Sequence, residues 1–302
     1  MSADVLLVTC APLPDGELDG HLLVEDLAAR GLGARWVAWD DADVDWSRAG
    51  VVAVRSTWDY ESRREEFLDW SASVGPALLN GADVFAWNTE KAYLLDLLAA
   101  GLPVVPSVLA GTRGEVAAAA RGFGVAVCKP VVGAGGRGVV VIDRPGVPID
   151  GDGPWLVQPL VESVRSEGET SVFTIDGRAV AQVRKLPGAG EVRVHEEYGG
   201  RSGAVPLEDE HAALATRTVR VAEELLGARL AYARVDLMRL ADGTLAVGEL
   251  EATEPGLYLD LVPEVATAFG AMVAGRLAYN EAGERSRVLR PKPRRTHEGP
   301  SG

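Results

Sequence analysis

Apolar residues in the first third of the chain fall into short runs separated by stretches with helical spacing. Three runs of Val, Leu and Ala predict buried strands, at residues 4–9, 36–39 and 51–54. A helix is expected over 17–30, where four leucines share one face: Leu18, Leu22, Leu23 and Leu27. A second helix is expected over 63–74. This alternation of strand and helix predicts a parallel, doubly wound layer at the N-terminus.

The rest of the chain combines further apolar runs with long helical patterns. The runs predict strands at 125–130, 139–142, 155–161, 171–175, 179–183, 234–239 and 247–251. Turn residues at 176–177 and 241–244 join the last four of these runs in pairs, which predicts two β-hairpins. Helices are expected from a cap at Asn88 or Thr89 to Gly101, and over 115–121, 208–227 and 263–279.

Charge and composition narrow the classes of partner. The chain has 302 residues and a formal net charge of −14, so it should repel nucleic acid and anionic membranes. No apolar run reaches the length of a membrane span. The N-terminus carries Asp4 and no basic segment, which favours a first core strand over a signal peptide. Cys10 and Cys128 lie in apolar runs, which predicts reduced, buried thiols in a cytoplasmic protein.

Three carboxylates sit on the second predicted hairpin. Asp236 lies in an apolar run, and Glu249 and Glu251 alternate with apolar neighbours, so the two glutamates point to one face of their strand. Folding the hairpin should bring Asp236 near them. Carboxylates gathered on one face repel one another unless a cation holds them, and hard oxygen ligands suit magnesium. The alternative is a charged hairpin face in solvent.

A glycine-rich loop joins two of the predicted strands, with Lys129 and Pro130 at its base. Gly133, Gly135, Gly136 and Gly138 free the backbone to approach anionic oxygens. A strand and not a helix follows, so the dinucleotide-binding fingerprint does not fit, and the Walker sequence is missing. The pattern favours a flap over phosphates, with Lys129 beneath it. The alternative is a plain turn and a lysine that reaches solvent.

The order of these motifs resembles the ATP-grasp superfamily. The Lys-Pro pair with its glycine loop, the strand end at 158–161 and the three carboxylates follow one another within residues 88–275. The resemblance implies an α/β (α+β) ATP-grasp fold, in which a doubly wound pre-ATP-grasp layer at 1–88 precedes two subdomains that clasp ATP. These would span 89–280, with a lid at about 101–160. Residues 281–302 are polar and basic and are expected to form a disordered tail.

The same resemblance implies individual roles and two cofactors, ATP and magnesium. Lys91, Lys129 and the glycines Gly133, Gly135, Gly136 and Gly138 would surround the nucleotide phosphates. Backbone groups of the hinge Gln158, Leu160 and Val161 would read adenine, and either Glu162 or Glu169 would hold the ribose. Asp236, Glu249 and Glu251 would bind magnesium. Many members have Asn at the last of these positions, so Glu251 keeps an oxygen ligand and adds charge.

Arg193 lies between the hinge and the carboxylates, and it alternates with Val192 and Val194, so it faces away from the core. A guanidinium near the transferred phosphoryl group would stabilise its equatorial oxygens. The resemblance gives Arg193 that position, and we expect Arg193 and Lys129 to be catalytic. His195 shares the face of Arg193. It is either a substrate contact or a surface histidine.

The substrate site is expected where the third strand ends, because parallel sheets place ligands at that edge. Arg55 there is suited to bind a carboxylate, Asp59 an amino group, and Ser56 and Tyr60 line the same segment. A structural pair of Arg55 and Asp59 is the alternative. Glu254 follows the carboxylate strand closely and is expected on the acceptor side, unless it belongs to a plain turn.

The resemblance implies an ATP-dependent carbon–nitrogen ligase that activates a small amino-acid-type carboxylate as an acyl phosphate for attack by an amine. The resemblance is to the branch of small ATP-grasp enzymes that holds glutathione-synthetase-like ligases and O-ureido-D-serine cyclo-ligases, which form the antibiotic D-cycloserine. A small-molecule kinase and a non-catalytic nucleotide-binding module are the alternatives. No nucleic acid or membrane partner is expected, and ligases of this shape often pair into homodimers.

Overall fold

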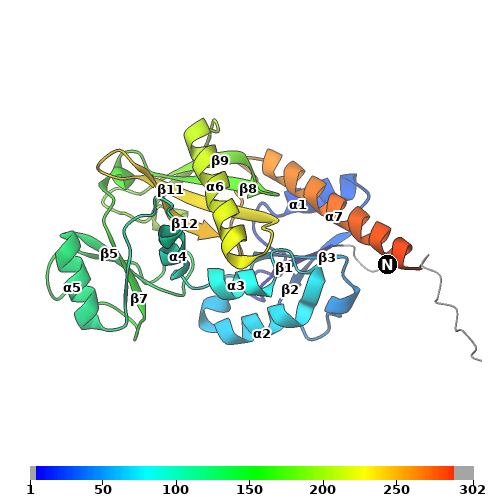
Figure 1. Ribbon diagram of the computed structural model, residues 1–302, viewed down its shortest axis with the longest axis horizontal. Coiled ribbons are helices and arrows are strands. Elements are labelled where there is room, and N and C mark those ends of the chain that lie inside the picture. The colour runs from blue at the N-terminus through cyan, green and yellow to red at the C-terminus, as the bar shows by residue number, and fades with distance from the viewer. Residues whose placement is uncertain (1–4, 289–302) are drawn as a thin grey trace, which may run out of the picture.

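The computed structural model describes residues 5–288, and side chains through residue 280. In this part of the chain the strands form three sheets (Figure 1). The N-terminal sheet has the order β2-β1-β3, built from β1 (Val5–Thr9), β2 (Ala34–Ala38) and β3 (Val51–Ser56). All its pairings are parallel, which confirms the parallel layer predicted from the hydrophobic pattern.

The N-terminal sheet is covered on both faces because its residues alternate between two cores. Leu6 and Val8 pack in the cluster that holds Phe67 and Phe85, on helices α2 (Arg64–Val74) and α3 (Ala82–Asn88). Val5 and Leu7 pack in the cluster of α1 (His21–Ala29) and α7 (Glu264–Val288). The layer is therefore doubly wound, and its second face is shared with the C-terminal helix.

The central sheet is antiparallel and has the order β10-β9-β8-β11-β12. Its strands are β8 (Glu169–Ile175), β9 (Arg178–Leu186), β10 (Arg201–Val205), β11 (Tyr232–Arg239) and β12 (Leu245–Glu251). Helix α6 (Asp209–Leu226) packs on the face that carries Val172 and Val235. The opposite face meets α7 through Phe173 and Tyr232.

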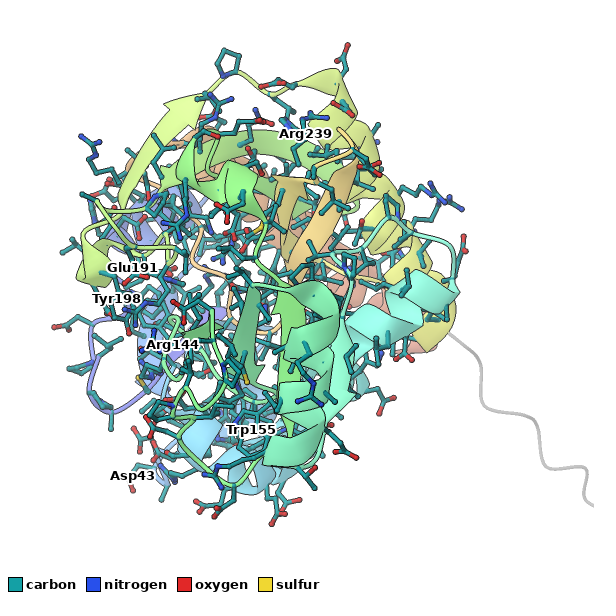
Figure 2. The ribbon with its side chains drawn as sticks, turned by 90° about the vertical axis from the view of Figure 1, so that its left-hand side faces the viewer. Asp43, Arg144, Trp155, Glu191, Tyr198 and Arg239 are labelled. Carbon is teal, nitrogen blue, oxygen red and sulfur yellow. The ribbon has the colours of Figure 1, made fainter. Side chains whose placement is uncertain are left out.

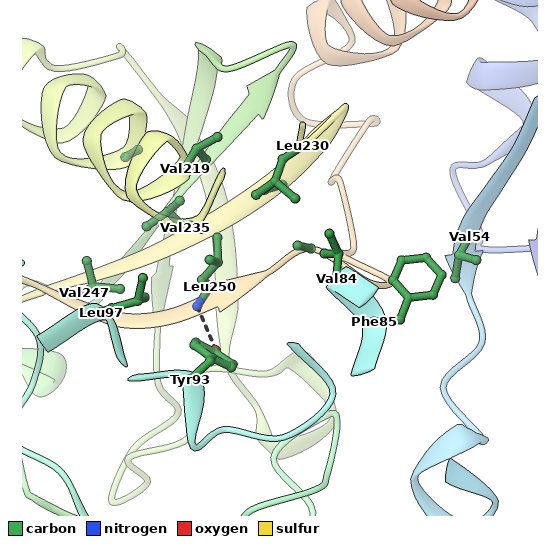
Figure 3. Packing of buried hydrophobic residues seen from close by; sticks show 14 of the residues in the cluster. Val54, Val84, Phe85, Tyr93, Leu97, Val219, Leu230, Val235, Val247 and Leu250 are labelled. Atoms are coloured by element: carbon green, nitrogen blue, oxygen red, sulfur yellow. Dashed lines mark hydrogen bonds between the residues drawn. The ribbon is translucent and has the colours of Figure 1, made fainter. Parts of the chain in front are cut away.

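Helix α4 (Tyr93–Ala99) packs beside β12. The Leu250 backbone N–H donates to the Tyr93 hydroxyl at 2.9 Å, within a buried cluster that also contains Leu97 and Val247 (Figure 3). This contact fixes the start of α4, and with it Lys91, against the strand that carries the glutamates.

The third sheet is a separate antiparallel layer, at the left of Figure 1, with the order β4-β7-β5-β6. Its strands are β4 (Val108–Ala110), β5 (Ala126–Pro130), β6 (Val140–Ile142) and β7 (Trp155–Pro159). Helix α5 (Arg113–Phe123) covers one face and starts with a capping box of Thr112 and Glu115. The glycine loop joins β5 to β6 and projects from this layer.

The structure corrects three of the predicted elements. Helix α1 begins at His21, and Leu18 is 99% exposed, because the preceding turn buries Glu17 instead. Asn88 ends α3 rather than capping α4; its side chain bonds the backbone of β12 and the residues after it. The tail expected from residue 281 is helical to Val288, because its glutamates, alanine and arginines favour helix. Residues 289–302 of that tail lie outside the described residues.

The two cysteines, Cys10 and Cys128, are both buried and free, as predicted. None of the helices among the described residues is long and apolar enough to cross a membrane.

Candidate active site

A cleft of about 1210 Å³, open to solvent, lies where the three sheets meet. The lid layer contributes Lys129, Gln158 and the glycine loop, the central sheet contributes the glutamates of β12, and the N-terminal layer contributes Tyr60. A cleft lined by apolar residues together with a few convergent charged groups is typical of a ligand site. Most of the side chains predicted to bind nucleotide line it.

Two lysines meet Glu249 on the floor of the cleft. The ammonium of Lys91 lies 2.6 Å from Glu249 Oε1, and that of Lys129 lies 3.8 Å from Oε2. Burial opposes ionisation of Glu249, but the lysines outweigh it and hold its pKa at about 2. Burial lowers the pKa of Lys129, and the charge of Lys91 adds to that effect. The charge of the Lys129 ammonium is therefore only partly balanced by Glu249, and a bound anion would balance it further.

Cross-strand pairing arranges the charges behind the lysines. The register sets Asp236 opposite Glu249 and Arg234 opposite Glu251. Arg234 donates to both oxygens of Asp236, at 2.9 and 2.8 Å, and pairs with Glu251 at 2.5 Å. Burial works against the ionised form of Asp236, but Arg234 and Lys185 hold its pKa well below the usual range.

The same region is rich enough in carboxylates to attract a cation. Burial, with Asp236 and Glu249 nearby, raises the pKa of Glu251 to about 8, and burial raises that of Glu254 to about 7. In the described residues, no three His, Cys, Asp or Glu side chains converge as a ready metal cage. Asp236 and Glu251 pair with Arg234, and Glu249 pairs with Lys91. Those oxygens are still the donors that magnesium takes when it bridges protein and phosphate, so this donor set fits the ion.

The far half of the cleft is apolar and suits a flat heterocycle. Val105, Val127, Val161 and Met238 line it together with the hinge residues Gln158 and Leu160. The Gln158 amide is buried and donates to Ser107 at 2.9 Å, and the Leu160 N–H donates to Val125 at 3.0 Å. The hinge is thus held rigidly against the lid sheet.

The two candidates for the ribose contact lie in different surroundings. Glu169 lines the cleft and pairs with the buried ammonium of Lys185. Burial raises the pKa of Glu169, and Lys185 opposes that rise. Glu162 is exposed and pairs with Arg165 at 3.2 Å. It is not among the residues that line the cleft.

The glycine loop forms the outer wall of the cleft. Gly135, Gly136 and Gly138 have φ values of 61°, 68° and 70°, a conformation that other residues rarely adopt. The ammonium of Lys91 donates to Gly133 O at 2.9 Å. A β-carbon at Gly136 would lie 2.9 Å from His195 Nδ1, so this glycine is needed for close approach as well as for its φ.

Arg193 lines the cleft but is engaged by its own loop. It donates to Glu191 at 2.5 Å, and its guanidinium carbon lies 3.5 Å from the centre of the Tyr198 ring. Figure 2 shows Glu191 and Tyr198 next to each other on this loop. The hydrogen bond from Arg193 lowers the pKa of Glu191 to about 2. To reach a phosphoryl group, Arg193 would exchange Glu191 for the phosphate oxygens.

His195 lies in the cleft wall, which rules out the alternative of a simple surface histidine. Its Nδ1 is buried and has no hydrogen-bond partner within the described structure. Burial lowers the pKa of His195 to about 4, and the charges of Lys185 and Arg234 add to that effect. The ring is therefore neutral near pH 7 and presents a nitrogen that lacks a partner.

Part of the predicted substrate set lies elsewhere. Arg55 is fully buried, pairs with Glu17 at 2.9 Å and donates to Pro255 O at 2.6 Å. Ser56 is buried too and donates to Thr9 at 2.8 Å. These two residues are outside the cleft, because the strand end turns their side chains into the interior. The structural alternative for Arg55 holds, with Glu17 and not Asp59 as its partner.

The other predicted substrate residues divide in the same way. Asp59 accepts a hydrogen bond from Trp39 Nε1 at 2.9 Å and does not line the cleft. Tyr60 and Glu254 do line it, and Tyr60 opposes the rise that burial causes in the pKa of Glu254. Both side chains are buried in the part of the cleft that the N-terminal layer contacts.

No role was assigned to Arg234 or Lys185 from the sequence. Arg234 lies two residues before Asp236 on β11, so strand periodicity already put both on one face. Lys185 is 2% exposed and pairs with Glu169 and Asp236. Its signal was weaker, because the strand that leads to it ends in two adjacent basic residues and only the structure tells which one points inward.

Comparison with known families gives two matches along the chain. The profile of the D-cycloserine synthetase DcsG N-terminal domain matches residues 5–80. The profile of the prokaryotic glutathione synthetase ATP-grasp domain matches residues 98–240.

Individual proteins extend these matches over about nine tenths of the chain. The cycloserine biosynthesis protein DcsG of Streptomyces lavendulae is 32% identical, over 90% of this chain and 98% of its own length. A probable alpha-L-glutamate ligase of Haemophilus influenzae is 28% identical, over 67% and 70%. The crystal structure of D-cycloserine synthetase DcsG superposes with a TM-score of 0.78 at 31% identity, covering 90% and 99%. The ATP-grasp ligase PsnB shares the fold, with a TM-score of 0.65 at 18% identity over 91% and 100%.

Proposed function

The chain belongs to the ATP-grasp family and is an ATP-dependent ligase, and on that premise we propose that it activates a small amino-acid-type carboxylate as an acyl phosphate. The observation that carries the proposal is the Lys91–Glu249–Lys129 cluster, set beneath a glycine flap and beside an apolar slot. On this proposal residues 1–88 supply the substrate side of the cleft and residues 89–280 clasp the nucleotide.

The protein would act mainly by holding charge in a fixed geometry. Lys91 and Lys129 bind the phosphates, and the apolar slot with the hinge at 158–161 takes the adenine. Arg193, once released from Glu191, stabilises the oxygens of the phosphoryl group during its transfer. Asp236, Glu249 and Glu251 would hold magnesium, which supplies further neutralisation of phosphate charge when bound.

We propose O-ureido-D-serine as the substrate and D-cycloserine as the product. The support is a DcsG relative that aligns over 98% of its own length and a superposition with the D-cycloserine synthetase structure. The chemistry fits an intramolecular reaction, in which the nitrogen bonded to the side-chain oxygen attacks the activated carboxyl carbon and phosphate leaves. The carbamoyl group on that nitrogen is then removed by water and leaves as carbon dioxide and ammonia. Tyr60 and Glu254 close the end of the cleft where the acceptor nitrogen would lie. A cytoplasmic location and a homodimer stay predictions.

The test is ADP release with magnesium and ATP, measured against small amino acids, dipeptides and O-ureido-D-serine. We expect release that depends on O-ureido-D-serine, together with D-cycloserine detected by mass spectrometry. Without magnesium, or in Glu249→Gln, turnover should fall by at least about a hundredfold, because a ligand to the phosphate-neutralising ion is lost. A stable phosphorylated product would show a kinase instead, and ATP binding without turnover on any compound would favour a binding module.

A further inference from the structure

The glycine flap is held from the side by the N-terminal layer. Glu61 lies on the short 3₁₀ turn Tyr60–Ser62. Its Oε2 accepts the backbone N–H of Ala134 at 3.1 Å, and its Oε1 accepts Arg137 Nε at 2.6 Å. Arg137 also donates to Trp58 O at 3.1 Å. One short segment, residues 58–61, therefore makes three hydrogen bonds to a flap that belongs to a different sheet.

The same segment forms part of the substrate side of the cleft. Tyr60 lines the cleft together with Glu254, and it opposes the rise that burial causes in the pKa of Glu254. Trp58 Nε1 donates to Glu254 O at 3.4 Å. Contacts thus run without a gap from the acceptor end of the cleft through residues 58–61 to the tip of the flap.

We propose that Glu61 is a positioning residue that latches the flap, so that closure over the nucleotide depends on the order of the substrate-side segment 58–61. The inference rests on the proposed role of the flap in covering the ATP phosphates. The consequence is that flap closure depends on substrate binding, because a substrate that orders Tyr60 and Glu254 also favours the closed flap. Without bound substrate, closure of the flap would be less favourable. ATP would therefore be protected from attack by water only when the substrate carboxylate that receives the phosphoryl group is present.

An ordinary surface ion pair would not have this effect. The side chains of Arg137 and Glu61 are 47% and 25% exposed, and such pairs contribute little by themselves. What distinguishes Glu61 is the second oxygen, which accepts a backbone N–H of the flap. Three of the residues after Ala134 are glycines with positive φ, so an unanchored loop there has many conformations to lose on closing.

The direct readout is hydrogen exchange of the flap amides, residues 133–138, in the full-length protein. We expect faster exchange in Glu61→Ala than in wild type, both with and without ATP. Glu61→Gln keeps an acceptor and should have an intermediate effect. Glu65→Gln is the matched control, because Glu65 is exposed on the adjacent helix α2. Unchanged exchange in Glu61→Ala would overturn the latch.

The functional readout is the ratio of ADP released to product formed with O-ureido-D-serine. In Glu61→Ala we expect this ratio to rise, and the KM for ATP to rise about five- to tenfold, the usual effect of losing a charge-assisted contact. Glu61→Gln, which keeps an acceptor for the Ala134 N–H, should restore the ratio in part relative to Glu61→Ala, which a general loss of stability would not do. Faster flap exchange with an unchanged ratio would overturn the coupling.

The latch and the proposed function fail in different ways. A wild-type protein that binds no ATP would overturn the proposed function. Normal turnover in wild type with normal exchange and coupling in Glu61→Ala would overturn only the latch.

Discussion

Lys129 is the residue on which the nucleotide assignment depends most. It is partly buried and lies farther from Glu249 than Lys91 does, so a phosphate would complete its surroundings. We predict that Lys129→Ala weakens ATP binding by about 10- to 100-fold, the range expected when one contact to a charged group is lost. Isothermal titration calorimetry with ATP and magnesium measures this. Arg144→Ala, an exposed change in the same layer, should leave affinity unchanged. Equal ATP affinities in the two variants would show that Lys129 does not bind ATP and has only a structural role.

His195 should make stability depend on pH. Its pKa in the folded protein is about 4, against 6.5 for an ordinary histidine. The unfolded chain therefore takes up a proton at a higher pH than the folded protein does. The stability that this neutral ring contributes is full above pH 6.5 and is lost as the pH falls from 6.5 to about 4, by at most about 3 kcal/mol.

Urea unfolding at several pH values tests this prediction. His195→Gln should flatten the fall in the free energy of unfolding between pH 6.5 and 4, whereas His21→Gln, on the exposed side of α1, should not. The same slope in wild type and His195→Gln would contradict the assigned environment.

At the scale of residues, the sequence indicated which charged residues require a partner better than it indicated where their side chains point. Lys129 and Glu249 could be singled out because a charge in an apolar strand requires a partner, and Lys91 was proposed through the family resemblance. Arg55 could not, because its buried partner Glu17 comes from the turn before α1, 38 residues away and in a segment predicted as helix. Side chains at strand ends point either into the interior or into a cleft, and local periodicity does not distinguish the two.

At the scale of elements, the pairing of β11 and β12 was the most predictable part of the site. Strict alternation and a turn signal fixed the shared face of Asp236 and Glu249, and the register sets them opposite each other. The short elements β4, β10 and α3 were missed. They form through long-range contacts, and their own hydrophobic patterns are too short to indicate them.

Asn88 shows such a long-range contact. Its amide donates to Leu250 O at 2.8 Å and accepts the N–H groups of Ala252 and Thr253 at 2.7 and 3.1 Å. We predict that Asn88→Ala lowers the free energy of unfolding by about 2–4 kcal/mol, because several buried backbone groups lose their partner. Chemical denaturation measures the loss, with Ser73→Ala on the exposed face of α2 as the control. A loss equal to that of the control would show that β12 ends correctly without Asn88.

At the scale of the whole molecule, three sheets each supply a different part of one cleft. The parallel N-terminal layer and the order of the motifs could be predicted from the sequence. The contact between residues 58–61 and the flap could not, because it joins segments about 75 residues apart that belong to separate layers. The net charge of −14 would repel ATP at long range, so binding depends on the local pair Lys91 and Lys129.

The central claim is that ATP activates a carboxylate of the substrate as an acyl phosphate. The most direct test uses O-ureido-D-serine labelled with ¹⁸O in its carboxylate, incubated with the protein, ATP and magnesium. Attack of the carboxylate on ATP, followed by displacement of phosphate by the nitrogen bonded to the side-chain oxygen, transfers one labelled oxygen to inorganic phosphate. We predict one ¹⁸O in the released phosphate for each ring formed. Product formation with unlabelled phosphate, or label retained in a stable phosphorylated compound, would contradict the account.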